Sequence, residues 1–80
     1  MTPDEAQQMI EEVLAEIVPG TDLAELGTDS DLRESLELDS LDFLSFVEAL
    51  SDRCGRRIEE DDYPRLATIE DGVTFLTEAD

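Results

Sequence analysis

The sequence predicts an all-α fold, a small four-helix bundle of three main helices and one short helix, with a long loop between the first two. Three segments carry apolar residues at steps of three and four, which is the period of an amphipathic helix. Each segment begins after a residue that commonly caps helices, and the first two end at proline or glycine. No segment has a convincing strand pattern, and no internal repeat or second domain is evident. We therefore expect residues 1–80 to form one helical domain.

The first main helix is expected to begin at Pro3. Thr2 is a suitable N-cap, proline fits the first helical position, and Glu5 completes a capping box. The helix should end before Pro19 and Gly20. One apolar stripe follows the helical period and consists of Ala6, Met9, Ile10, Val13, Leu14 and Ile17.

The connection from residue 20 to residue 39 is rich in Asp, Ser, Thr and Gly. Thr21 and Ser30 are each suitable caps for a short turn, so one or two brief helical turns are expected here. Loops that are pinned at several points often carry function. The apolar residues expected to anchor this one are Leu23, Leu26, Leu32, Leu36 and Leu38.

The second main helix is expected to have Asp39 as its N-cap, Ser40 at its first position and Asp42 at its third, and to stop at Gly55. Its apolar stripe consists of Phe43, Leu44, Phe46, Val47, Leu50 and Cys54. A different face begins beside Ser40 and should be exposed. Its residues follow steps of four, three and four: Leu41, Ser45, Glu48 and Asp52.

The short third helix is expected within residues 59–63, after an extended segment at residues 56–58. Pro64 should limit its length, because proline lacks the N–H that a helix interior needs. The last main helix should follow Thr68 as its cap, with Asp71 at its third position. Its apolar positions are Ile69, Val73, and Phe75 or Leu76.

Charge is the second strong signal in the chain. Asp and Glu number 23 against five Arg and no Lys, which gives a formal net charge of −18. Such a chain is repelled by nucleic acids and by anionic membranes, so neither is an expected partner, although mimicry of DNA remains open. The expected partners are basic protein surfaces. The chain is 40% hydrophobic, and the helical spacing of those residues favours a folded domain over disorder.

Several classes of site are disfavoured by composition. One cysteine, Cys54, cannot form an internal disulfide, and without histidine a Cys/His zinc site is out of reach. The acidic runs at residues 29–31 and 59–62 lack the spacing of a calcium loop, so no metal site is expected. Cys54 falls on an apolar stripe with no His or Lys to activate it, and no catalytic residue is expected. No signal peptide or membrane-spanning run is apparent, so a cytoplasmic monomer is expected.

The segment at residues 36–44 reads Leu-Glu-Leu-Asp-Ser-Leu-Asp-Phe-Leu. It resembles the prosthetic-group attachment segment of acyl and peptidyl carrier proteins, and the resemblance extends from the first helix to residues 69–71. It implies the four-helix arrangement of that family and a protein that is not an enzyme. It also implies that Ser40 carries 4′-phosphopantetheine, which a phosphopantetheinyl transferase takes from coenzyme A. The arm then holds acyl or aminoacyl groups as thioesters for other enzymes.

The position of Ser40 agrees with this role on physical grounds. The free N–H groups and the dipole of a helix N-terminus favour an anion by about 0.3–1 kcal/mol. Asp39 and Asp42 oppose this by like-charge repulsion, and their charge is better suited to a basic patch on a modifying enzyme. We expect the recognition surface for partner enzymes to comprise Asp39, Leu41, Asp42, Ser45, Glu48 and Asp52.

Two simpler interpretations of Ser40 and of the whole protein remain open. Serine near a helix N-terminus is common, and the other serines are expected to be ordinary capping or surface residues: Ser30, Ser35, Ser45 and Ser51. The whole protein could instead be a non-covalent acidic adaptor for a basic partner, in which case Ser40 would stay unmodified.

Four departures from the carrier pattern concern partner choice. Glu37 stands where carriers commonly have glycine, Ser45 replaces a frequent acid, and Glu48 replaces an apolar residue of many fatty-acid carriers. Three arginines at residues 53, 56 and 57 also bring positive charge to a region that is usually acidic. These features favour a discrete carrier in a fatty-acid-like, polyketide or other specialised pathway over the general fatty-acid carrier.

Overall fold

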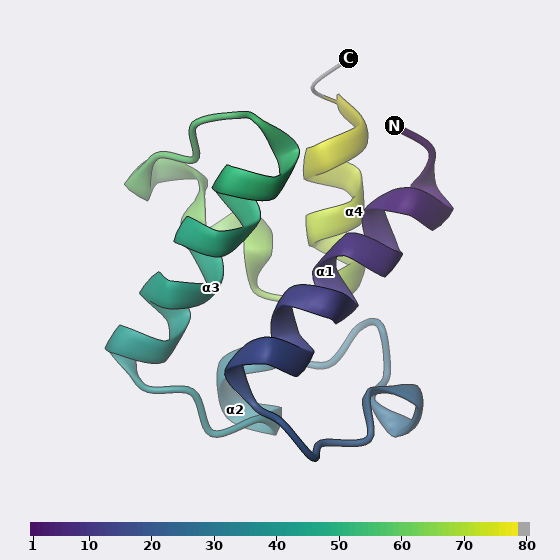
Figure 1. Cartoon of the computed structure of the whole chain (residues 1–80), viewed down its shortest axis with the longest axis vertical. Coiled ribbons are helices and arrows are strands. Elements are labelled where there is room, and N and C mark those ends of the chain that lie inside the picture. Colours follow the sequence, from purple (N-terminus) through teal and green to yellow (C-terminus); the bar gives the residue numbers. More distant parts are fainter. Residues whose placement is uncertain (79–80) are drawn as a thin grey trace.

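The computed structural model describes residues 1–78, and within them it is helical with no strand. Three long helices form the bundle: α1 (Pro3–Ile17), α3 (Ser40–Cys54) and α4 (Ile69–Glu78). A short helix α2 (Leu32–Ser35) and two 3₁₀ helices, η1 (Leu23–Glu25) and η2 (Glu60–Leu66), lie in the connections. Figure 1 shows α1 beside α4, with α2 at the end of the bundle where α3 begins. The expected all-α architecture is confirmed.

The three expected helix starts are present. Thr2 caps α1: its hydroxyl accepts from the Glu5 N–H at 3.2 Å, and the Glu5 carboxylate accepts from the Thr2 N–H at 3.0 Å. Thr68 caps α4 in the same way, with its hydroxyl 3.0 Å from the Asp71 N–H. Asp39 is the N-cap of α3. Each cap satisfies N–H groups that a helix leaves without partners.

The core lies where the inner faces of α1, α3 and α4 meet. Both Phe75 and Leu76 are buried, so α4 contributes a wider face than a single stripe. Leu44 was expected in the core but is 39% exposed, because it lies at the edge of the stripe centred on Phe43 and Leu50. The buried hydrophobic residues are Ala6, Ile10, Val13, Leu14, Leu32, Leu38, Phe43, Phe46, Val47, Leu50, Ile58, Leu66, Ile69, Phe75 and Leu76.

Gly72 is explained by the packing of α4 on α1. A Cβ placed on this buried residue would lie 2.8 Å from the Cδ1 atom of Ile10. Glycine costs about 1 kcal/mol relative to alanine inside a helix. Here it allows the two helices to approach closely.

The long connection is anchored as expected, but its turns are capped differently. Asp31, not Ser30, caps α2, since its carboxylate accepts from the Glu34 N–H at 3.0 Å. The expected cap was one residue too early, and the Ser30 N–H bonds instead to the carbonyl of Gly27. The 3₁₀ turn η1 begins at Leu23, two residues after Thr21, so Thr21 is not at its N-cap position either.

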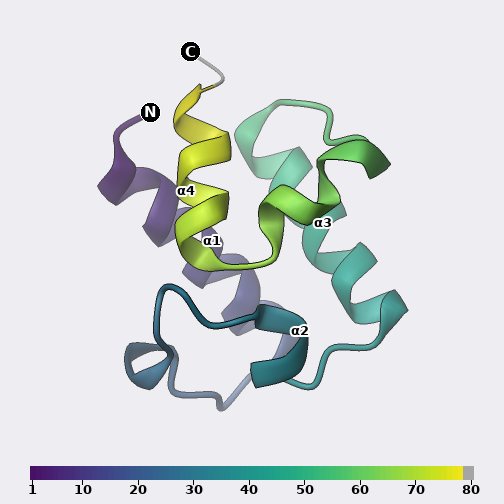
Figure 2. The ribbon, with the colours of Figure 1, turned by 180° about the vertical axis from the view of Figure 1, so that it is seen from behind.

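Two backbone hydrogen bonds tie this connection to the last part of the chain. The Leu32 N–H donates to the carbonyl of Ala67 at 2.8 Å, and the Glu70 N–H donates to the carbonyl of Thr28 at 2.9 Å. Figure 2 shows the loop crossing beneath the start of α4. These bonds therefore fix the second part of the loop, which precedes α3, against the segment around the start of α4.

The short third helix is longer than expected and of a different type. η2 runs two residues past Pro64, so the expectation that Pro64 would limit its length was wrong. A 3₁₀ helix avoids the i to i−4 hydrogen bonds whose geometry proline disrupts. Leu66 at its end is fully buried and fixes the segment on the core.

Within residues 1–78, no helix is both long enough and apolar enough to cross a bilayer. Over the same residues, no group of three or more Asp, Glu, Cys or His side chains is arranged to hold a metal ion.

Candidate functional site

The start of α3 is a closed capping box built from two aspartates. The Asp42 N–H donates to the Asp39 carboxylate at 2.8 Å, and the Asp39 N–H donates to the Asp42 carboxylate at 3.5 Å. Asp39 is thus the N-cap and Ser40 the first helical residue, as expected. Ser40 is exposed. Its hydroxyl therefore projects from the helix end, where another protein can reach it.

The chain enters this helix through a left-handed residue. Glu37 has φ of 55°, a backbone conformation that residues other than glycine adopt at a cost in free energy. The Leu38 N–H donates back to the carbonyl of Arg33 at 2.9 Å, which closes the end of α2. Leu38 itself is buried, only 6% exposed. The chain reverses at Glu37 and buries Leu38, and Ser40, two residues later, is exposed.

Two parallel rows of side chains run along α3 from this point. Ser40, Leu44, Val47 and Ser51 follow steps of four, three and four, so they share one face. The neighbouring row contains all four residues of the expected exposed face, and all four are exposed: Leu41, Ser45, Glu48 and Asp52. Leu41 is 73% exposed, which is unusual for a leucine of this core-forming helix. Of the flanking aspartates, Asp39 is exposed and Asp42 is half-buried.

A hollow of about 270 Å³ lies beside Ser40. Its walls are an arginine of α2, two apolar residues of α3 and a tyrosine of η2, and together with the serine they are Arg33, Ser40, Phe43, Leu44 and Tyr63. The aromatic rings of Phe43 and Tyr63 meet edge to face, with centroids 5.8 Å apart. This wall was not expected from the sequence.

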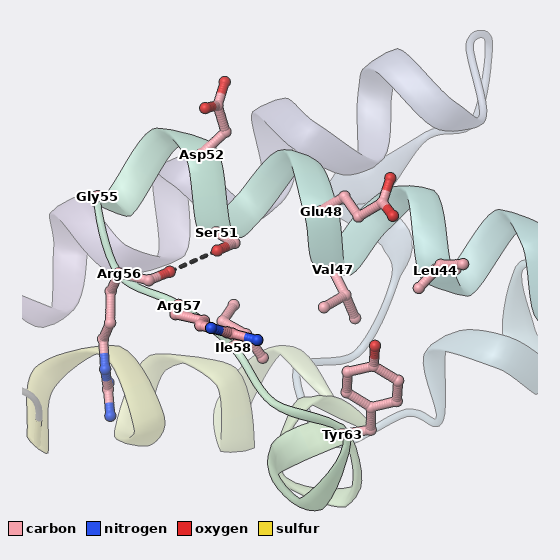
Figure 3. Close-up of a pocket in the computed structure, with 10 residues that line it drawn as sticks. All are labelled: Leu44, Val47, Glu48, Ser51, Asp52, Gly55, Arg56, Arg57, Ile58 and Tyr63. Carbon is pink, nitrogen blue, oxygen red and sulfur yellow. Dashed lines mark hydrogen bonds between the residues drawn. The ribbon is translucent and has the colours of Figure 1, made fainter.

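A larger groove of about 560 Å³ continues along the Ser40 row and shares Leu44 and Tyr63 with the hollow. Figure 3 shows Val47 of α3 and Tyr63 of η2 pointing toward one another across it. Its far end is polar: the Ser51 hydroxyl donates to the Arg56 carbonyl at 2.5 Å, and Arg57 borders the same end. Polar groups also occur near the hollow, where Glu48 and the Tyr63 hydroxyl lie close to Leu44 and Val47, so the groove has mixed polar and apolar walls.

The arginines expected to bring positive charge to the end of α3 are mostly engaged elsewhere. Arg53 crosses to α1 and pairs with Glu12 and Glu16. Arg56 lies over the ring of Phe75, 4.2 Å from its centroid, and donates to the carbonyl of that residue. Arg57 pairs with Glu59, two residues further along the chain. The acidic row on α3 thus keeps its negative character.

Comparisons with known proteins place this geometry in a family. The family model described as "Phosphopantetheine attachment site" matches residues 4–76. An acyl carrier protein of Rubrobacter xylanophilus is 31% identical over 98% of this chain and 95% of its own length. The chain belongs to the acyl carrier protein family. Its cofactor is 4′-phosphopantetheine, and it is a carrier of acyl groups, not an enzyme.

Further members of the family agree with this assignment, and a solved structure has the same fold. Acyl carrier proteins of Saccharopolyspora erythraea and Streptomyces coelicolor are 38% and 35% identical, over 86% and 98% of this chain and 72% and 87% of their own lengths. A solved structure of the acyl carrier protein from Enterococcus faecalis superposes with a TM-score of 0.78 at 20% identity, covering all of both chains. That structure confirms the fold expected for this acyl carrier.

The residues at the start of α3 fit the prosthetic group of the family. A phosphodiester needs an accessible hydroxyl and room beside it, and Ser40 is exposed at the rim of a hollow that also has a cationic wall. The residues that sequence reasoning missed here are Arg33 and Tyr63. Both come from segments distant in the sequence, and the motif around Ser40 contains no signal for either.

Proposed function

We propose that this protein is a discrete acyl carrier whose 4′-phosphopantetheine is attached at Ser40 and whose cargo belongs to a specialised biosynthetic pathway. The observation that carries the proposal is the exposed Ser40 hydroxyl at the first position of α3, held there by the Asp39–Asp42 capping box. When bound, the group supplies a flexible arm that ends in a thiol and holds the acyl group as a thioester.

Ser40 acts as the nucleophile when coenzyme A is the donor. Its oxygen forms a bond to the phosphorus next to the pantetheine, the pyrophosphate bond breaks, 3′,5′-ADP leaves, and the hydroxyl proton is released. The carboxylates of Asp39 and Asp42 already accept backbone N–H groups of the cap. They hold the turn, and the base that takes the proton is assigned to the phosphopantetheinyl transferase as part of this proposal.

The exposed row on α3 is the proposed docking surface for that transferase and for the enzymes that load and process the cargo. It combines Leu41, an exposed apolar contact, with the carboxylates of Glu48 and Asp52. A basic partner surface would be attracted quickly and released easily, because exposed charge pairs act mainly on association. Nucleic acid and membranes are not proposed partners, and a monomer in the cytoplasm is the proposed state.

The arm tethers one acyl group within reach of several active sites, which replaces free diffusion by a high effective concentration. The groove supports a cargo with polar substituents, because its walls are apolar at Leu44 and Val47 but polar at Ser51 and Arg57. A fully reduced fatty acyl chain would match only the apolar part of these walls. This favours a polyketide-like or otherwise functionalised acyl group.

Intact mass spectrometry tests the attachment. Incubation with coenzyme A and a broad-range phosphopantetheinyl transferase should add the mass of one phosphopantetheine group. Ser40→Ala should abolish the gain, and Ser35→Ala, an exposed serine of α2 outside the docking row, should retain it. No gain in the unmodified protein would refute the proposal and favour the non-covalent adaptor. A gain that survives Ser40→Ala would refute attachment at Ser40.

A further inference from the structure

The hollow beside Ser40 contains a cation whose charge has no carboxylate partner. Arg33 of α2 lines this hollow together with Ser40 itself. Its guanidinium lies over the ring of Phe43, 5.4 Å from the centroid, a contact that restrains the side chain by a cation–π interaction. Arg33 is exposed, so its donors remain open to solvent and to a ligand.

The other arginines of the described residues are all occupied. Three of them pair with carboxylates: Arg53 with Glu12 and Glu16, Arg57 with Glu59, and Arg65 with Glu78. Arg56 donates to a backbone carbonyl of α4. Within residues 1–78, Arg33 is therefore the arginine with no ion pair and no side-chain hydrogen bond, in a chain with 23 acidic residues.

We propose that Arg33 is the residue that holds the phosphate of the prosthetic arm. This inference rests on the proposed attachment at Ser40, because that attachment puts one negative charge directly on the Ser40 oxygen. A guanidinium presents parallel N–H donors that match two phosphate oxygens, and the Phe43 ring already restricts its position. Arg33 is thus a binding residue for the phosphate, supplied by the loop helix α2 and not by α3.

The consequence concerns the direction in which the arm leaves Ser40. Arg33 and Tyr63 stand on the side of the hollow, whereas Leu41 stands on the neighbouring exposed row. A phosphate held by Arg33 therefore directs the start of the arm into the hollow and away from Leu41. The positive charge also offsets the repulsion that Asp39 and Asp42 exert on the phosphate.

A double-difference melting experiment tests this assignment. The thermal midpoint is measured for the apo and holo forms of the unmodified protein and of Arg33→Gln. The holo midpoint minus the apo midpoint should be higher in the unmodified protein than in Arg33→Gln by about 2–4 °C. This is the effect expected of one exposed bidentate ion pair in a domain of this size. Arg53→Gln is the matched control: it should lower both midpoints and leave the holo-minus-apo shift unchanged.

Phosphorus NMR of the holo protein provides a second readout. The ³¹P resonance should differ between the unmodified protein and Arg33→Gln, and added salt should move the first toward the second. Equal holo-minus-apo shifts together with identical ³¹P resonances would overturn the role of Arg33 while leaving attachment at Ser40 intact. Failure of Ser40 to gain mass at all would instead overturn both proposals.

Discussion

Replacing Glu37 by glycine should stabilise this protein. Glu37 has φ of 55°, in the left-handed region that costs a side-chain-bearing residue about 1–2 kcal/mol. Glycine adopts this conformation freely but gives up about 0.5–1 kcal/mol through the greater freedom of the unfolded chain. The net expectation for Glu37→Gly is a gain of about 0.5–1 kcal/mol in the free energy of unfolding, or about 2–8 °C in the thermal midpoint.

Urea titration followed by circular dichroism measures this gain. Glu37→Gln is the control for charge, because it keeps the side chain and removes one negative charge, and it should change stability by less than about 0.5 kcal/mol. Glu34→Gly is the control for position: it places glycine inside α2, where the same change should destabilise by about 1 kcal/mol. A Glu37→Gly protein that is no more stable than the unmodified one would refute the reasoning from backbone strain.

Three further predictions concern packing, pH and salt. Gly72→Ala should lower the free energy of unfolding, measured in urea, by about 1 kcal/mol, because the new methyl 2.8 Å from Ile10 costs about 1–3 kcal/mol and the gain in helix propensity is about 1 kcal/mol. In an Ile10→Val background, which lacks the contacted methyl, the same substitution should be neutral or stabilising. An equal loss of stability in both backgrounds would show that the contact with Ile10 is not the cause. Hydrogen bonds from Thr2 lower the pKa of Glu5 below its ordinary value of 4.5, so the stability that this carboxylate adds is complete above that value and is lost as the pH falls through the lower folded-state pKa. The midpoints of the unmodified protein and Glu5→Ala should therefore converge as the pH is lowered below 4.5, whereas a constant gap would contradict the shift. Finally, the net charge of −18 predicts that the midpoint rises as salt is added from about 10 to 150 mM, because screening weakens self-repulsion; a midpoint independent of salt would contradict this.

The parts of the fold that depend on neighbouring residues were predictable from the sequence. The caps at Thr2, Asp39 and Thr68 each need only a side chain and an N–H three residues away. The stop at Gly55 needs only a residue that accepts φ of 68°. For the same reason the exposure of Ser40 followed from its position on the first turn of α3.

The features that were missed depend on residues far apart in the chain. Leu44 fits the apolar period of α3, but it lies at the edge of the buried stripe and borders the groove that Tyr63 of η2 also lines. The hollow beside Ser40 needs Arg33 and Tyr63 to meet there, from segments whose packing no local pattern specifies. The role of Gly72 likewise required the approach of α4 to Ile10.

Peptide mapping of the holo protein tests the central claim most directly. After modification, the protein is digested and the fragment that spans the start of α3 is sequenced by tandem mass spectrometry. The account predicts that the added phosphopantetheine mass lies on Ser40. The same mass found on Ser35, Ser45 or any other residue, or a start of α3 that stays unmodified, would contradict it.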